Sequence, residues 1–318
     1  MPTNFLVTTA TPTTPSSTYH IPEKTTVSTP LTDPASFGTY IQSLRSVNHP
    51  IHRIPKAAHP SFASGLSKLF NKAISSNSPF DWHRLVCFSL SVLLSGPQSQ
   101  GVSLTSSIKS RINTYSTLNQ LACLSLKLLR QATPPPTTTH NDPAKNMKRL
   151  VNQKLSDFNV KGTLQTLSDN CSFANPNEES FNTLQQKHPQ APDDLKPPPP
   201  PDADTSPICY STAQIRAAIS SFPHGSGAGL DGLRPQHLKD YISITAGDAS
   251  TSLLISLKEL VNYLANGHLL TDLRPFLYGA QLHGLCKSNG DLKPIAVGCT
   301  YQRLVAKSLL ESLHSKAP

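Results

Sequence analysis

Residues 277–307 read LYGAQLHGLCKSNGDLKPIAVGCTYQRLVAK and hold the most consistent local signals in the chain. Two short apolar runs, 277–285 and 292–297, flank the dipeptide Asn289-Gly290. This dipeptide accepts the positive φ angles of a tight turn, so the pattern predicts a β-hairpin. A glycine ends the second run, and the apolar residues after it recur at helical spacing. The stretch therefore predicts two strands joined by a turn, and then a helix.

Four basic residues lie around this hairpin and helix. Lys287 and Lys293 flank the turn, while Arg303 and Lys307 lie one helical turn apart. Such cations suit a triphosphate or a nucleic-acid backbone, because arginine binds two phosphate oxygens and lysine adds a mobile charge. The alternative is a solvated hairpin whose lysines only keep an edge strand soluble. On the first interpretation, the four groups converge on the opening (mouth) of a single binding site.

The composition limits the class of protein. The chain has 318 residues, 29 prolines and only 15% charged residues, which predicts modest helical modules joined by linkers. The six cysteines form no CxxC pair and no zinc-finger spacing with histidine, so neither a zinc module nor a disulfide scaffold is predicted. The sequence shows no signal peptide and no apolar run of membrane-spanning length. We expect an intracellular protein with no membrane partner; nucleus and cytoplasm are not distinguished.

Changes in composition divide the chain into four parts. Residues 1–35 are rich in Thr and Pro and predict a disordered arm. Residues 36–175 predict a basic helical region, residues 176–208 a disordered, acidic, proline-rich linker, and residues 209–318 a unit that holds the hairpin. The expected fold class is α+β, mostly helical in the amino-terminal region.

The net charge of +9 lies mainly in the helical region before the linker. Residues 36–130 carry ten Lys or Arg against one acidic residue. This excess is a candidate footprint for a nucleic-acid backbone, where binding comes chiefly from counterion release. A basic surface without any partner is the alternative.

Helical spacing, caps and prolines predict the individual helices. They are expected to begin near Pro60, Asp81, Leu118, Pro143, Val160, Ser211 and Leu253. Asp81 is expected to be an N-cap, and Ser211 with Gln214 matches a capping box. Trp82, the only tryptophan, is expected in the core.

Two motifs resemble one protein family. Residues 287–298, KSNGDLKPIAVG, followed by residues 303–307, RLVAK, are similar to the fingers hairpin of reverse transcriptases from retroelements that lack long terminal repeats. Residues 227–239, GAGLDGLRPQHLK, are similar to the segment that opens the fingers in the same family. The resemblance implies that residues 209–318 are a truncated fingers subdomain of an RNA-directed DNA polymerase.

The resemblance assigns roles to six basic residues. It implies that Lys287, Lys293 and Arg303 bind a nucleotide and that Arg234, Lys239 and Lys307 contact nucleic acid. The implied partners are RNA and/or DNA, with a dNTP and Mg²⁺ in a complete family member. Where the family has arginine before Pro-Ile this chain has Lys293, and Gln302-Arg303 stands for a basic pair, so a weaker grip on triphosphate is expected.

The residues that would carry out polymerisation are missing from the sequence. Palm aspartates hold two magnesium ions in this family, and they would follow Lys307. Asp193-Asp194 cannot replace them, because the pair lies in the proline-rich linker and not on rigid strands. We therefore expect no catalytic residue, no metal site and no polymerase activity in this chain. A standalone basic nucleic-acid-binding remnant and a nonfunctional relic are the alternatives.

Three further expectations concern the carboxy-terminal unit. The glycines of residues 225–229 allow close approach to a nucleic-acid strand or form a hinge. Asp231 is either a turn cap or, as the family suggests, a structural acid. In a complete family member, a palm would cover the apolar helix at residues 253–264. Without a palm, we expect exposed apolar surface and poor solubility.

Overall fold

The computed structural model describes residues 34–47, 50–94, 102–117, 143–168, 174–175, 177–188, 206–287 and 289–314. Several expectations lie outside these residues. They are the amino-terminal arm up to residue 33, the helix near Leu118, the pair Asp193-Asp194 and the polyproline part of the linker.

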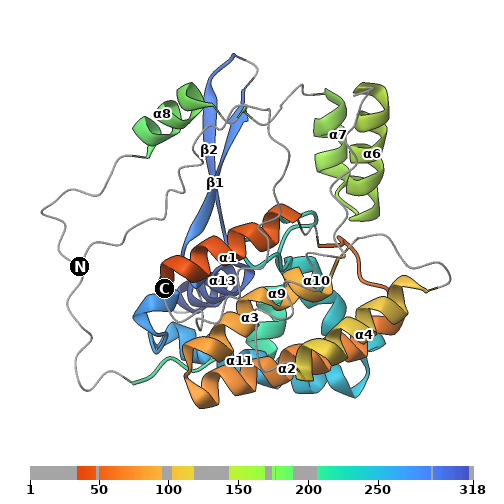
Figure 1. Ribbon diagram of the computed structural model, residues 1–318, viewed down its shortest axis with the longest axis vertical. Coiled ribbons are helices and arrows are strands. Elements are labelled where there is room, and N and C mark those ends of the chain that lie inside the picture. The colour runs from red at the N-terminus through yellow and green to blue at the C-terminus, as the bar shows by residue number, and fades with distance from the viewer. Residues whose placement is uncertain are drawn as a thin grey trace, which may run out of the picture.

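Helices make up most of the described chain (Figure 1). In the first part they are α1 (Pro34–Val47), α2 (His59–Ser76), α3 (Pro79–Val92), α4 (Leu104–Thr117), α6 (Pro143–Ser156), α7 (Val160–Ser168) and α8 (Glu178–Lys187). In the second part they are α9 (Thr212–Ser220), α10 (Pro235–Tyr241), α11 (Asp248–Ala265), α12 (Arg274–Leu277) and α13 (Thr300–His314). Short 3₁₀ helices cover Lys56–Ala58, Ile244–Ala246 and Thr271–Leu273. None of the described helices is long and apolar enough to cross a bilayer.

The predicted hairpin is confirmed. β1 (Ala280–Cys286) pairs antiparallel with β2 (Leu292–Gly298), and Cys286 lies opposite Leu292 at the turn. Gly290 has φ 81°, the positive angle that the Asn-Gly signal predicts. In Figure 1 the two strands project from the helices. Helices plus this two-stranded sheet confirm the α+β class for the described chain.

The amino- and carboxy-terminal parts share one hydrophobic core. Buried residues form a single cluster that runs from Phe37 in α1 to Val305 in α13. α2 packs along α11, and inside this interface the hydroxyl oxygens of Ser67 and Ser256 lie 2.7 Å apart. The apolar face of α11 is therefore covered by the chain's own helices, and the expectation that it lies exposed is wrong. Helical spacing identifies the face that is buried but not the helix that covers it.

Local signals at helix ends have mixed outcomes. Ser211 and Gln214 form both hydrogen bonds of the predicted capping box. Trp82 is fully buried, as predicted. Asp81 is not an N-cap, because α3 already begins at Pro79, and the Asp81 carboxylate accepts a hydrogen bond from Ser76 Oγ at 2.7 Å instead.

The expected linker contains a helix, α8, that lies against the hairpin (Figure 1). The Asn177 side chain accepts a hydrogen bond from the Ser180 amide at 2.8 Å, and two glutamates occupy the first turn, where acidic groups favour a helix. At the other end, Lys187 Nζ donates to the Leu292 carbonyl of β2 at 2.8 Å. This part of the linker is therefore docked on the hairpin.

Neither α1 nor α4 was expected from the sequence.

Candidate nucleic-acid interface

The loop at residues 225–233 packs directly on the junction between β2 and α13. At Gly229 a Cβ atom would lie 2.6 Å from the Cys299 Cα and 2.7 Å from the Gly298 carbonyl oxygen. Thr300 Oγ1 donates to the Leu233 carbonyl at 2.6 Å. The close approach that glycine permits here is thus to the chain's own backbone.

Asp231 is buried inside this loop. Its Oδ1 accepts a hydrogen bond from the Leu233 amide at 3.4 Å, which confirms the turn-cap interpretation. Its Oδ2 makes no hydrogen bond within the described residues. Burial raises the pKa of the Asp231 carboxyl to about 7, although the guanidinium groups of Arg303 and Arg45 oppose this rise. Near neutral pH the carboxyl is therefore partly protonated.

Three of the six predicted site residues contact one aromatic residue, Phe222. The Phe222 cluster consists of Phe222, Lys239, Arg303 and Lys307. Arg303 Cζ lies 5.8 Å and Lys307 Nζ 5.1 Å from the centre of the Phe222 ring, within cation–π range. Lys239 Nζ donates to the Phe222 carbonyl at 2.6 Å. Partial burial, and then the neighbouring Lys307, lower the pKa of Lys239. Like charges held this closely favour an anion beside them.

Arg303 also joins the two segments that carry the family resemblance. Its Nη2 donates to the Gly227 carbonyl at 2.6 Å and to Thr300 Oγ1 at 3.1 Å. Burial lowers the pKa of this guanidinium. The residue is half-buried: its Nη2 is used inside the protein, whereas its buried Nε makes no hydrogen bond within the described residues.

Lys287 and Lys293 lie near the far end of the hairpin. Six residue-to-residue steps lead from the first residue of β2 to its last, which at about 3.3 Å per step is roughly 20 Å. The hairpin therefore holds these lysines away from Arg303 and Lys307, and the four groups do not form one mouth. Lys293 is exposed. Lys287 Nζ lies 2.7 Å from Asp291 Oδ2, and Lys187 and Lys287 together hold the pKa of that carboxyl well below its usual range.

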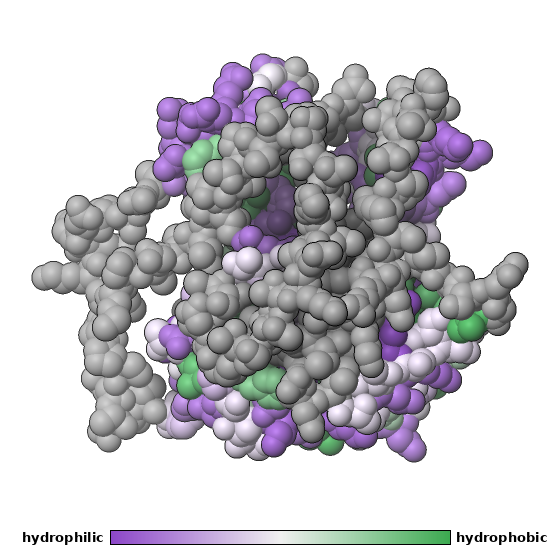
Figure 2. Space-filling model, viewed as in Figure 1, coloured by the Kyte–Doolittle hydropathy of each residue, from purple (hydrophilic) through white to green (hydrophobic). Residues whose placement is uncertain are grey.

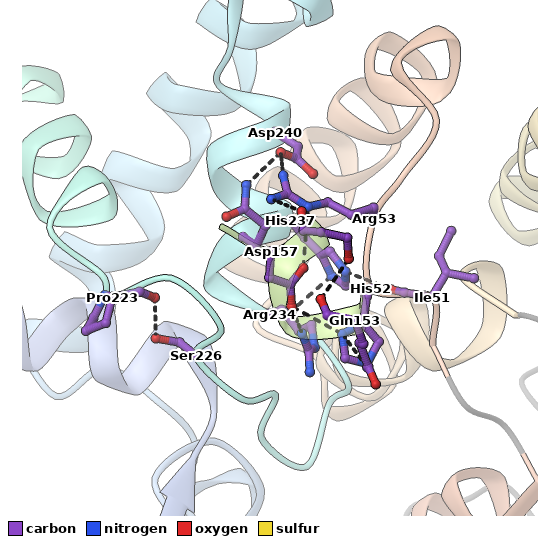
Figure 3. A network of polar contacts seen from close by, with 12 residues as sticks. Ile51, His52, Arg53, Gln153, Asp157, Pro223, Ser226, Arg234, His237 and Asp240 are labelled. Atoms are coloured by element: carbon purple, nitrogen blue, oxygen red, sulfur yellow. Dashed lines mark hydrogen bonds and ion pairs between the residues drawn. The ribbon is translucent and has the colours of Figure 1, made fainter. Parts of the chain in front are cut away.

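Arg234 faces into the protein. Figure 3 shows Asp157 between three groups: Arg234 Nη1 at 3.4 Å, Arg53 Nε at 3.4 Å and His52 Nδ1 at 3.5 Å. The Asp157 residue is only 4% exposed and the Arg234 side chain only 16%. The expected contact between Arg234 and a template is therefore replaced, in this structure, by a carboxylate of the same chain.

His237 supports the same network. Its Nδ1 accepts from the Arg234 amide at 3.2 Å, and its Nε2 donates to the Ile51 carbonyl at 2.9 Å (Figure 3). Burial, and then the charge of Arg234, lower the pKa of His237 to about 3. The ring is thus neutral and fixes the backbone beside Arg234. Arg53 Nη1 lies 3.7 Å from Asp240, which adds a second carboxylate at the edge.

The charge excess of residues 36–130 overstates the cations available to a ligand. Arg84 donates to the Tyr115 carbonyl and Arg111 to the Leu94 carbonyl, each at 3.0 Å. The lysines of this region within the described residues are exposed, namely Lys56, Lys68, Lys72 and Lys109. Composition gave the number of charges but not the internal carbonyls that bind the arginines.

The described residues contain no group of three or more His, Cys, Asp or Glu side chains placed to hold a metal ion. No catalytic step is assigned to these residues. Comparison of the chain with models of known families, with curated proteins and with solved structures gives no match.

Proposed function

We propose that the chain is the amino-terminal and fingers portion of a retroelement reverse transcriptase, and that by itself it binds nucleic acid without polymerising. The observation that carries the proposal is the direct contact between the two segments that resemble the family. Residues 227–239 and 287–307 are separated in sequence, yet Gly227 binds Arg303 and Leu233 binds Thr300. Two motifs that act together in one subdomain are expected to touch in this way.

The Phe222 cluster is the proposed contact for the nucleic-acid backbone. Lys239, Arg303 and Lys307 carry positive charge on one small surface, and each keeps at least part of its side chain accessible. Lys293, exposed on the hairpin, is the proposed contact for a nucleotide phosphate. Lys287 contributes less, because Asp291 already neutralises it.

Fluorescence anisotropy with a labelled single-stranded RNA tests the binding proposal. Lys307→Glu is expected to weaken binding by about tenfold at low salt and to reduce its salt dependence, since one phosphate contact is lost. Lys258→Glu is the matched control, because Lys258 lies on α11 in a surface pair with Glu259. Equal weakening in the two variants would mean that only net charge matters and would contradict a role for the cluster.

Primer extension tests the second half of the proposal. Purified chain with primer, template, dNTP and Mg²⁺ is expected to add no nucleotide, since the described residues contain no group of three or more His, Cys, Asp or Glu side chains placed to hold a metal ion. Extension above a no-protein control would overturn this expectation.

A standalone nucleic-acid-binding module is the second candidate. It is favoured by the ion pairs of Lys287 and Arg234, which already occupy two of the six residues expected to bind ligands. The two candidates differ in nucleotide binding. A fluorescent dNTP that binds the chain, and binds less well to Lys293→Gln, favours the fingers; RNA binding without dNTP binding favours the module.

A further inference from the structure

Within the described residues, the helix pair α6 and α7 contacts the rest of the protein mainly through its elbow, residues 156–159. Arg53 Nη2 donates to the Ser156 carbonyl at 3.0 Å, and the Arg53 guanidinium lies 5.4 Å from the centre of the Phe158 ring. Beyond the elbow, α7 exposes its apolar stripe: Val160, Leu164 and Leu167 are each about 60% exposed. Figure 1 shows the pair standing apart from the other helices. Its attachment therefore depends mainly on polar contacts at one end.

The centre of that attachment is a carboxylate held by groups of the protein body. His52, Arg53 and Arg234 surround Asp157, and all three come from outside α6 and α7 (Figure 3). Gln153 of α6 adds a contact to His52. Burial and the charge of Arg234 lower the pKa of His52, so the two guanidinium groups supply most of the positive charge. Paired arginines are the usual protein groups for phosphate as well as for carboxylate.

The carboxylate does not satisfy this site fully. Its contacts to the three groups are 3.4–3.5 Å long, whereas charge-assisted hydrogen bonds are typically about 2.7–2.9 Å. Arg53 Nε and Asp157 Oδ1 are both buried and lie 3.4 Å apart as an ion pair, but neither makes a hydrogen bond. A phosphate has more acceptor oxygens than a carboxylate and can meet donors that arrive from several directions. With Asp157 as its anion, the site therefore keeps donor capacity that the carboxylate does not use.

We propose that His52, Arg53 and Arg234 form a binding site for a backbone phosphate of nucleic acid, and that Asp157 occupies it in this structure. Backbone phosphate and the elbow then compete, and binding releases α6 and α7 from the body. This inference rests on the proposed function, since it takes nucleic acid as the ligand. Arg234 would then contact nucleic acid, as the sequence suggested, but only after Asp157 has left the site.

Asp157→Asn in the full chain tests the site with two probes. Glu259→Gln is the matched control, because it changes the net charge equally at an exposed position on α11. Inorganic phosphate is expected to raise the melting temperature of Asp157→Asn more than that of the control. Labelled single-stranded RNA is expected to bind Asp157→Asn about tenfold more tightly than the wild type, roughly the effect of one charge-assisted contact. Adding Arg234→Gln to Asp157→Asn should remove both gains.

The two probes separate the inference from the proposed function. If every form binds RNA but Asp157→Asn behaves like Glu259→Gln with both probes, the function stands and the phosphate site is overturned. If phosphate stabilises Asp157→Asn but no form binds RNA, the anion site stands and the proposed function fails.

Hydrogen exchange on the wild type covers the case in which Asp157→Asn does not fold. Competition predicts that saturating RNA speeds amide exchange at residues 157–163, because the elbow leaves the body. Unchanged or slower exchange there, with RNA bound, would overturn the inference.

Discussion

Two buried titratable residues near the candidate interface act on stability in opposite directions. Asp231 has a pKa of about 7 in the folded protein, so between about pH 4 and 7 the folded state keeps a proton that the unfolded chain has lost. Its contribution to stability therefore falls as pH rises through this window. His237 has a pKa of about 3, so between about pH 3 and 6.5 the unfolded chain binds the extra proton. Its contribution rises with pH.

In the Asp231→Asn variant, the dependence of the unfolding free energy on pH is expected to follow the titration of His237. With the carboxyl removed, the free energy of unfolding should rise with pH between about 4 and 6.5 by up to roughly 1.4 kcal/mol per pH unit. At pH 8 the variant should be more stable than the wild type, because it buries no carboxylate. Urea unfolding at a series of pH values measures this, with the exposed Asp272→Asn as control. A variant with the wild-type pH profile would contradict the assignment to Asp231.

Gly229→Ala tests the contact between the loop and the start of α13. The added methyl group would meet backbone atoms of Gly298 and Cys299 at 2.6–2.7 Å, so we expect a loss of about 1–3 kcal/mol in unfolding free energy. Gly227→Ala is the matched control in the same loop, since its nearest neighbour would be Val297 Cγ1 at 3.9 Å. The control should change stability by about 0.5 kcal/mol or less. Equal effects would show that the close approach does not limit this position.

At the scale of elements, α11 joins the two halves of the chain. Leu257 is fully buried in the shared core, and Leu257→Ala should cost about 2–5 kcal/mol of unfolding free energy. Ile255 on the same helix is 49% exposed, so Ile255→Ala should cost about 0.5 kcal/mol or less. Chemical denaturation measures both. Similar small losses would mean that α11 is not held against α2.

The sequence predicted the elements whose signals are local. The hairpin turn at Asn289-Gly290, the Ser211 capping box and the helix after Gly298 each depend on a few neighbouring residues. The partners of these elements could not be predicted, because an apolar stripe is compatible with any complementary helix. The packing of α2 on α11 and the docking of α8 on the hairpin are of this kind.

The candidate site shows the same limit. The sequence identified Lys239, Arg303 and Lys307 as cations of interest, but not that all three contact Phe222. The family resemblance placed Arg234 at nucleic acid, whereas its acidic partner in the structure, Asp157, lies 77 residues earlier in the chain. No spacing rule links two charges so far apart, so sequence alone could not tell an internal ion pair from a free cation.

For the whole molecule, one shared core predicts one cooperative transition. Trp82 in α3 lies with its ring 5.6 Å from that of Tyr263 in α11, so its fluorescence reports on the joint between the two halves. Fluorescence and far-UV circular dichroism should therefore give the same midpoint in urea. Two separated midpoints would show that the amino- and carboxy-terminal parts unfold independently. The space-filling view in Figure 2 shows polar and apolar residues mixed over the lower described surface, as expected when the apolar helix faces are already packed.

Because α2 packs on α11, α2 must remain without this partner during synthesis until α11 has been translated. Ser67 and Ser256, which meet in that interface, are 189 residues apart. At about 5–20 residues per second, a ribosome needs roughly 10–40 s to make the second helix after the first has been made. Until then the apolar face of α2 has no α11 to cover it. A nascent chain with this topology is therefore expected to bind chaperones for most of its translation, and slower elongation between these two helices would prolong its exposure to aggregation.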